Sequence, residues 1–207
     1  REYVTSNYII MCTKAGIVKK TLLEAYSRPR QNGVNAITIK EGDQLIEAKL
    51  TSGDSEVLLA AKEGKAIRFN EKAVRPIGRT GAGVKGITID GDDEVVGMIC
   101  VEKDRKEDIL VVSEHGYGKR TDLADYRITN RGGKGVKTLQ ITEKTGKLIA
   151  IKAVTDENDL MIINRSGLTI RIPVGDIRLA GRATEGVTVI NLGGGASVGG
   201  GGGLRGG

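Results

Sequence analysis

Short apolar runs recur along the chain, and each is followed by a polar turn with a glycine and then by a segment of alternating apolar and polar residues. Runs of four or five apolar residues have the length of one strand. The segment behind each glycine fits the returning arm of a β-hairpin. The runs lie at 8–12, 57–61, 109–112 and 160–163, and the returning arms at 17–20, 66–69, 117–120 and 168–171.

Two independent glycine landmarks share one period. The first opens each returning arm at Gly16, Gly64, Gly116 and Gly167, with intervals of 48, 52 and 51 residues. The second is followed directly by valine and falls at Gly33, Gly83, Gly135 and Gly186, with intervals of 50, 52 and 51 residues. A repeat of this length is typical of propellers and related arrays, in which each unit buries its core against its neighbours.

Further strands complete each unit. Alternating segments follow the second glycine at 36–39, 87–89, 139–141 and 189–192, and another apolar run follows in the first three units at 45–48, 95–100 and 148–154. No segment shows a sustained 3.6-residue stripe. The pattern predicts an all-β fold, a propeller-like array of four-stranded blades.

The period divides a domain spanning 1–192 into units at about 8–56, 57–108, 109–159 and 160–192. Ten of the fifteen residues from 193 to 207 are glycine. Such a composition buries too little surface to offset the entropy of ordering, so we expect a flexible tail there.

Composition narrows the class of protein. Of the 207 residues 39% are apolar but only 3% aromatic, so the core is expected to be built from aliphatic side chains. The sequence has no uninterrupted apolar stretch long enough to span a bilayer and no apolar signal-peptide region at its start. It therefore predicts a cytoplasmic protein without a membrane partner. The formal charge of +6 favours polyanionic partners.

The sequence offers little material for catalysis. Cys12 and Cys100 lie in apolar runs and have no partner at metal-ligand spacing, and His115, the single histidine, lies in a turn. Paired acids such as Asp92 and Asp93 also fall in turns, which favours solvated positions over acid-base chemistry. We expect no catalytic residue, no metal site and no cofactor on this chain.

Basic residues recur in step with the repeat. Each first glycine is followed after four residues by a cation, at Lys20, Arg68, Arg120 and Arg171. The loops before and around the second glycine carry Arg28, Arg30, Arg75, Arg79, Lys85, Arg127, Arg131, Lys134, Lys137, Arg178 and Arg182, and Lys19 and Lys119 lie beside two of the fixed cations. Stacking the units around an axis would bring the loops to one rim, where they form a band that suits a sugar-phosphate backbone.

An alternative is that lysine and arginine only protect strand edges from aggregation. That role does not require equal offsets in successive units, so the pattern favours binding at the rim. The densest segment contains Arg131, Gly132, Gly133, Lys134 and Gly135. Its glycines allow backbone amides to approach an anion closely.

The segment 129–135 resembles the seven-residue signature of the C-terminal domain of the DNA gyrase A subunit, with five of seven positions in agreement. Degenerate copies at 78–87 and 181–187 and the hairpin return at 116–121 extend the resemblance over residues 8–192. Topoisomerase IV has a related domain. The resemblance implies a β-pinwheel whose blades exchange strands and whose basic perimeter wraps DNA in support of negative supercoiling.

The same resemblance implies a fragment of a domain of about six blades and places DNA cleavage on other domains of an ATP-dependent type II topoisomerase. The implied partners are double-stranded DNA, the rest of the gyrase A subunit, and the gyrase B subunit. Three alternatives stay open at this point: a topoisomerase IV domain, a protein-interaction propeller, and an RNA binder, against which the scarcity of aromatic residues counts.

Overall fold

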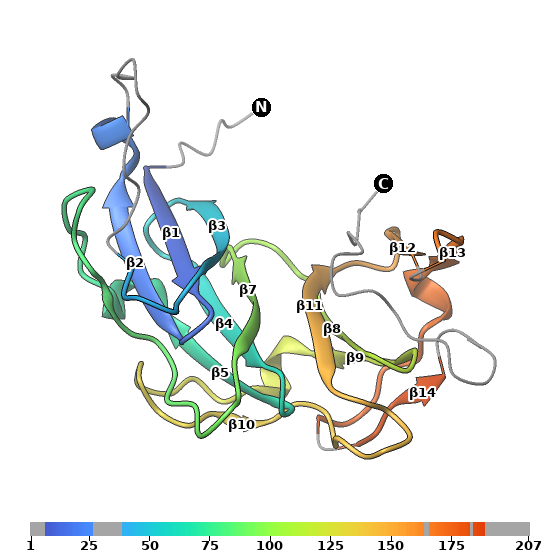
Figure 1. Ribbon diagram of the computed structural model, residues 1–207. Coiled ribbons are helices and arrows are strands. Elements are labelled where there is room, and N and C mark those ends of the chain that lie inside the picture. Colours follow the sequence, from blue (N-terminus) through green and yellow to red (C-terminus); the bar gives the residue numbers. More distant parts are fainter. Residues whose placement is uncertain (1–6, 27–38, 164–165, 183, 189–207) are drawn as a thin grey trace.

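A computed structural model of the chain describes residues 7–26, 39–163, 166–182 and 184–188 (Figure 1). Within these residues the regular structure consists of β-strands and short 3₁₀ turns, which confirms the all-β prediction. The 3₁₀ turns are η1 (Leu23–Tyr26), η2 (Glu71–Ala73), η3 (Leu123–Asp125) and η4 (Val174–Asp176). The described part contains no helix of the length and apolarity that crossing a bilayer requires.

The first blade shows how the repeats are joined. Its strands lie in the order β3-β1-β2-β6, and all neighbours are antiparallel. Three of them come from the first repeat: β1 (Tyr8–Thr13), β2 (Ile17–Leu22) and β3 (Leu45–Thr51). The outermost, β6 (Val84–Lys85), belongs to the second repeat. Each repeat thus completes the blade before it, which confirms the exchange of strands.

The next two blades repeat this topology. Blade 2 has the order β10-β5-β4-β7, with β4 (Glu56–Ala61), β5 (Lys65–Asn70), β7 (Val95–Val101) and the third repeat's β10 (Val136–Lys137). Blade 3 has the order β11-β8-β9-β14, with β8 (Asp108–Ser113), β9 (Tyr117–Asp122), β11 (Leu148–Val154) and the fourth repeat's β14 (Val187–Thr188). The described part of blade 4 is the hairpin of β12 (Asp159–Ile163) and β13 (Thr169–Pro173).

The exchanged strands correct one prediction. Strands were expected at 87–89 and 139–141, but the structure places them at 84–85 and 136–137. The pairing of β6 with β2 ends at Lys85, because the N–H groups of the next two residues, Gly86 and Ile87, both donate to the carbonyl of Gly16. Ile87 and Leu139 are instead buried between blades. Residues 36–38 of the segment expected at 36–39, the segment expected at 189–192, and the tail at 193–207 lie outside the described residues.

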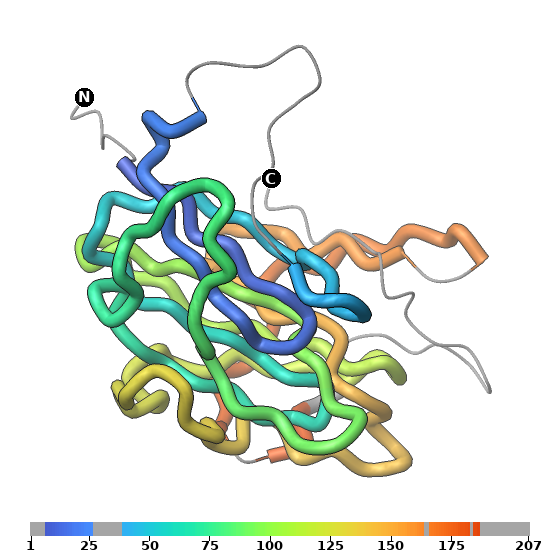
Figure 2. The backbone as a smooth tube through the Cα atoms, turned by 60° about the vertical axis from the view of Figure 1, so that its left-hand side comes forward, coloured from blue at the N-terminus to red at the C-terminus, as the bar shows by residue number. Residues whose placement is uncertain are grey.

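The core consists of three apolar layers, one between each pair of consecutive blades. Strand β4 shows the reason for its unbroken apolar run: Val57 and Leu59 pack toward blade 1, whereas Leu58 and Ala60 pack toward blade 3. A strand between two blades is apolar on both faces, so its sequence does not alternate. Figure 2, seen from the side of blade 1, shows the strands of successive blades stacked behind one another.

The blades follow one another around an open arc, with β3, β7 and β11 on its inner side (Figure 1). Strand β7 contacts both β3 and β11. The exchanged strands β6, β10 and β14 form the opposite edge of each sheet, on the outside of the arc. Loops that lead into the exchanged strands therefore lie on the outer perimeter.

Replacing Gly135 with alanine is expected to lower the free energy of unfolding by about 2 kcal/mol. Gly135 has φ +77°, and a Cβ atom there would lie 2.5 Å from the carbonyl oxygen of Ala66, where β10 joins blade 2. Urea denaturation measures the loss. Gly42→Ala is the matched control, because Gly42 has φ +84° but no atom within 4 Å of the added Cβ. Equal losses in the two variants would contradict a close approach at the strand exchange.

Candidate nucleic-acid interface

Three equivalent loops, here called the rim loops, cross from a 3₁₀ turn to the preceding blade and end in the exchanged strand. They span residues 74–85, 126–137 and 177–188, of which residue 183 is not described. In each loop, one backbone N–H donates to a carbonyl of the preceding blade at a distance of 2.8 Å. The donors and acceptors are Ile77 and Lys20, Thr129 and Arg68, and Ala180 and Arg120. The blades therefore present the three loops in the same way.

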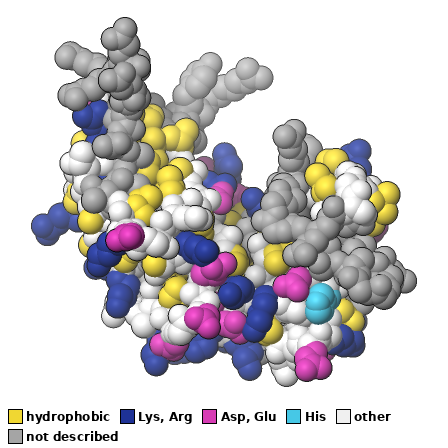
Figure 3. All heavy atoms as spheres, in the orientation of Figure 1, with side chains coloured by type: hydrophobic (Ala, Val, Ile, Leu, Met, Phe, Trp, Pro, Cys, Tyr) yellow, Lys and Arg dark blue, Asp and Glu magenta, His cyan; other side chains and the backbone are white. Residues whose placement is uncertain are grey.

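The rim loops are strongly cationic by sequence. They carry three, four and two lysines or arginines, respectively, against a single acid, Glu185, although the whole chain has 32 basic and 26 acidic residues. Charge is thus segregated onto the perimeter, and Lys and Arg side chains recur along the left and lower outline of the molecule (Figure 3).

Six of the predicted site residues are exposed on these loops: Arg75, Lys85, Arg127, Lys134, Lys137 and Arg178. In the described part of the chain none of the six forms an ion pair with a carboxylate. The three arginines among them recur at equivalent positions of the three loops, and unpaired exposed cations that recur in this way can contact successive phosphates of a polyanion. Arg28 and Arg30 lie outside the described residues.

A further cation of the perimeter was missed from the sequence. Lys65 at the start of β5 is exposed and lies directly opposite Lys137 of β10 in the antiparallel register. Like charges in such a pair destabilise a sheet. An anion bound between them would remove that cost. The sequence shows a lysine directly after Gly64, but it does not show that Lys65 lies opposite Lys137, because that pairing depends on the strand exchange.

Arg131 and Arg182 tie each rim loop to the loop before it. Arg131 donates through Nε to the carbonyl of Ala73 at 3.1 Å and through Nη1 to that of Lys85 at 2.7 Å. One repeat later, Arg182 donates to the carbonyls of Asp125 at 3.2 Å and Lys137 at 2.8 Å. These bonds use two of the five guanidinium N–H groups. Both side chains are half-buried, as is Arg79, so any phosphate contact would be made by the remaining edge.

The glycines of the dense segment also serve loop packing. The N–H of Gly132 donates to the carbonyl of Gly86 at 2.8 Å, and its carbonyl accepts from the Thr88 hydroxyl at 2.6 Å. The carbonyl of Gly133 accepts from the Thr88 N–H at 2.8 Å. The prediction that these amides bind an anion is therefore wrong for Gly132, because its N–H already donates to a backbone carbonyl. Gly135 has a different role, since the absence of a side chain there allows β10 to approach β5 closely.

Two predicted contacts are corrected by burial. The side chains of Lys19 and Lys119 are completely buried beneath rim loops. Nζ of Lys19 donates to the carbonyl of Arg79. Nζ of Lys119 donates to the carbonyls of Gly181 at 2.8 Å and Thr184 at 3.2 Å, and to that of Arg182. Neither ammonium can contact a phosphate. Both instead stabilise the rim loops by donating to their backbone carbonyls.

The cations at a fixed distance from the first glycine are also structural. Lys20 and Arg120 are buried, and Arg68 is largely buried. Each side chain donates to one or two backbone carbonyls in or beside the 3₁₀ turn of the next repeat. Each also lies close to an acidic side chain. The acids are Glu71 at 3.8 Å from Lys20, Glu56 at 3.4 Å from Arg68, and Asp108 at 2.8 Å from Arg120, which also pairs with Asp156. Their regular spacing therefore reflects the joining of blades. Arg171 is exposed and pairs with Asp159 at 2.7 Å.

Burial and the neighbouring Arg182 guanidinium lower the pKa of Lys119 to about 8, and burial also lowers the pKa of Lys19 and Lys20. Each of these shifts reflects the cost of keeping an ammonium away from water. For Lys20 the carboxylate of Glu71 opposes the shift.

The chain is expected to gain stability relative to its Lys119→Met variant as the pH rises from about 8 to about 10. The folded pKa of Lys119 is below the ordinary value of 10.5, so in this window the unfolded chain holds a proton that the folded chain has lost. Raising the pH therefore favours folding, whereas below pH 8 the proton is bound in both states. Urea denaturation of both proteins at about pH 7 and pH 10 measures the change. If the free energy of unfolding of the chain, relative to that of the variant, does not rise between about pH 7 and pH 10, the result would contradict a buried ammonium at Lys119.

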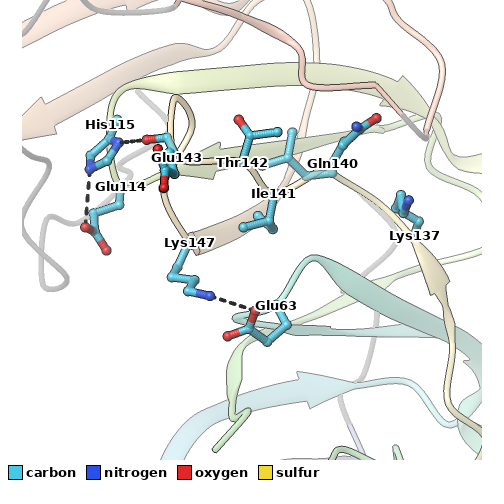
Figure 4. Close-up of a pocket in the computed structure, with 11 residues that line it drawn as sticks. Glu63, Glu114, His115, Lys137, Gln140, Ile141, Thr142, Glu143 and Lys147 are labelled. Carbon is cyan, nitrogen blue, oxygen red and sulfur yellow. Dashed lines mark hydrogen bonds and ion pairs between the residues drawn. The ribbon is translucent and has the colours of Figure 1, made fainter.

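The hairpin turns of blades 2 and 3 border an open hollow of about 780 Å³ (Figure 4). Two contacts join charged residues of its lining: Lys147 lies 2.8 Å from Glu63, and His115 lies 3.5 Å from Glu114 and contacts the carbonyl of Glu143 at 3.0 Å. Lys137, which also lines the hollow, forms no ion pair among the described residues. The described residues contain no cluster of potential metal ligands. Cys12 and Cys100 are free thiols, and burial raises the pKa of both, that of Cys100 to about 12.

A series of four-stranded blades, each completed by the following repeat and bordered by a cationic perimeter, defines a strand-exchanged class of propeller-like protein. The family described as DNA gyrase C-terminal domain, beta-propeller, matches four segments at 7–52, 55–102, 107–155 and 158–198. The chain belongs to this family.

Individual relatives agree with this assignment. The chain is 48% identical over 187 residues to the DNA gyrase A subunit of Staphylococcus aureus strains MRSA252 and NCTC 8325. The match covers 90% of this chain and 21% of each relative, so the chain spans about a fifth of their length.

Solved structures give the same fold. A crystal structure of the C-terminal domain of DNA topoisomerase IV matches with a TM-score of 0.86 and 27% identity, over 96% of this chain and 62% of that one. A DNA gyrase A C-terminal domain matches with a TM-score of 0.82 over 96% of this chain and 66% of that one. Its identity of 24% supports a likeness of fold alone.

Proposed function

We propose that this chain binds double-stranded DNA irrespective of sequence and bends it along the rim loops. The observation that carries the proposal is the segregation of nine cations and one acid onto three loops that equivalent hydrogen bonds hold on the outer perimeter. Phosphates recur at regular intervals along a duplex and are the same for every sequence. A repeated cationic rim matches that regularity without contacts to bases.

Family membership supports a more specific role. We infer that the chain acts as the C-terminal domain of a gyrase A subunit, in a cytoplasmic ATP-dependent type II topoisomerase that introduces negative supercoils. The rest of that subunit, together with the gyrase B subunit, would then be its partners, and DNA cleavage would take place on other domains. A role in topoisomerase IV is the second candidate, favoured by the TM-score of 0.86 to that enzyme's domain.

A salt titration of binding to a linear duplex tests DNA binding by the rim. Each phosphate contact is expected to contribute about −0.9 to the slope of log K against log salt concentration, so several rim cations should give a steep negative slope. Two duplexes of unrelated sequence should bind equally well, because phosphates carry no sequence information. A flat salt response, or a strong preference for one sequence, would contradict binding to the backbone.

A further inference from the structure

Each rim loop carries an arginine followed directly by an exposed apolar residue. The pairs are Arg75-Pro76, Arg127-Ile128 and Arg178-Leu179. Ile128 is 56% exposed and Leu179 52%, which places both among the most exposed large apolar side chains of the described residues. Single exposed apolar residues are common on protein surfaces. Three at one register of a repeat, each beside an exposed arginine, indicate a shared role.

The backbone at these positions is fixed. Pro76, Ile128 and Leu179 each form a parallel bridge with the preceding blade, at Lys20, Arg68 and Arg120, respectively. The residue after each donates its N–H to that same blade at 2.8 Å. The exposed side chains are therefore presented by an ordered part of the rim, so contacting a ligand would cost little backbone entropy.

The charge around these side chains identifies the kind of ligand. The rim loops hold nine cations and one acid, so a surface that covers them must be strongly anionic. A duplex alternates charged phosphates with apolar deoxyribose along each strand, just as the rim alternates arginine with an apolar residue. Proteins that bend DNA from the minor groove insert proline, isoleucine or leucine there.

We propose that Pro76, Ile128 and Leu179 contact the deoxyribose walls of the minor groove wherever it faces the rim of the bound duplex. The inference rests on the proposed function, since it requires DNA on the rim. The neighbouring arginines hold the phosphates on either side, and the apolar residues set how closely the duplex approaches. Affinity then has an apolar component that is independent of salt.

The test compares the chain with its Ile128→Ser/Leu179→Ser variant on two polyanions, a duplex longer than the rim and heparin. The variant is expected to bind the duplex about tenfold more weakly, because two apolar contacts are lost. The salt slope should stay unchanged, since no cation is removed. Binding to heparin should also stay unchanged, because heparin offers charge but no deoxyribose or groove. Exchanging the two residues, Ile128→Leu/Leu179→Ile, should restore duplex binding.

Two matched variants separate this contact from general effects. Leu50 on β3 is 57% exposed but lies on the inner side of the arc, so Leu50→Ser should leave both affinities unchanged. Arg127→Gln should weaken binding to both polyanions and reduce the magnitude of the salt slope by about 0.9.

The outcomes distinguish the inference from the proposed function. Unchanged duplex binding in the double serine variant overturns the inference alone. Equal losses on duplex and heparin, or a reduced salt slope, also overturn it, because the change would then act through charge. If the unaltered chain fails to bind the duplex in a salt-dependent way, the proposed function itself fails.

Discussion

Replacing Lys85, Lys134 and Lys137 together with glutamate is expected to weaken duplex binding by at least about a hundredfold near 0.1 M salt. All three side chains are exposed on rim loops and unpaired among the described residues, so their charge is available to phosphates. The salt slope should fall in magnitude by about 0.9 for each lost contact. Fluorescence anisotropy with a labelled duplex over a range of salt concentrations measures both quantities.

A second triple variant controls for net charge. Lys103, Lys106 and Lys144 are exposed but lie outside the rim loops. Their replacement with glutamate lowers the formal charge by the same six units, from +6 to zero. Binding should be affected far less, because exposed charges farther than about 10 Å from the phosphates are largely screened at this salt concentration. Similar losses in the two variants would show that overall charge, not the rim, governs affinity.

Arg120→Met is expected to lower the free energy of unfolding by about 3–5 kcal/mol. Arg120 is 6% exposed, and its guanidinium lies 2.8 Å from Asp108, also pairs with Asp156 and donates to the carbonyl of Val174 at 3.2 Å. Removing it leaves Asp108 without its partner and releases the turn that begins the rim loop of the fourth repeat. Urea denaturation measures the loss.

The fourth repeat supplies the matched control for this variant. Arg171 occupies the equivalent position and pairs with Asp159, but its side chain is 70% exposed. Arg171→Met should therefore cost less than about 1 kcal/mol. A small effect at Arg120 or a large one at Arg171 would contradict the view that burial makes this cation structural.

The sequence predicted the hairpins and inner strands because their signals are local. Gly16, Gly64, Gly116 and Gly167 mark turns between apolar runs of strand length, and the structure confirms β1–β2 and its three counterparts. The exchanged strands could not be located in this way. They are two residues long, too short to show periodicity, and their pairing depends on the blade before them.

The rim was predicted from repeated cations, but the same regularity concealed two roles. A cation at equivalent positions is expected both where it meets phosphate and where it joins successive blades, so the buried Arg120 and the exposed Arg127 could not be told apart by their regular recurrence. One distinguishing signal was present. An acid precedes Arg68, Arg120 and Arg171 by twelve residues, at Glu56, Asp108 and Asp159, and each forms a cross-strand ion pair. Burial of Lys119 had no such signal.

The linking number of circular DNA tests most directly whether the rim curves a duplex. Plasmid is relaxed by a nicking-closing enzyme with the chain bound, the protein is removed, and the topoisomers are separated by electrophoresis. The account predicts a shift of one consistent sign that grows with bound protein and is lost with the Lys85, Lys134 and Lys137 triple variant. A topoisomer distribution that stays unchanged at saturating binding would contradict it.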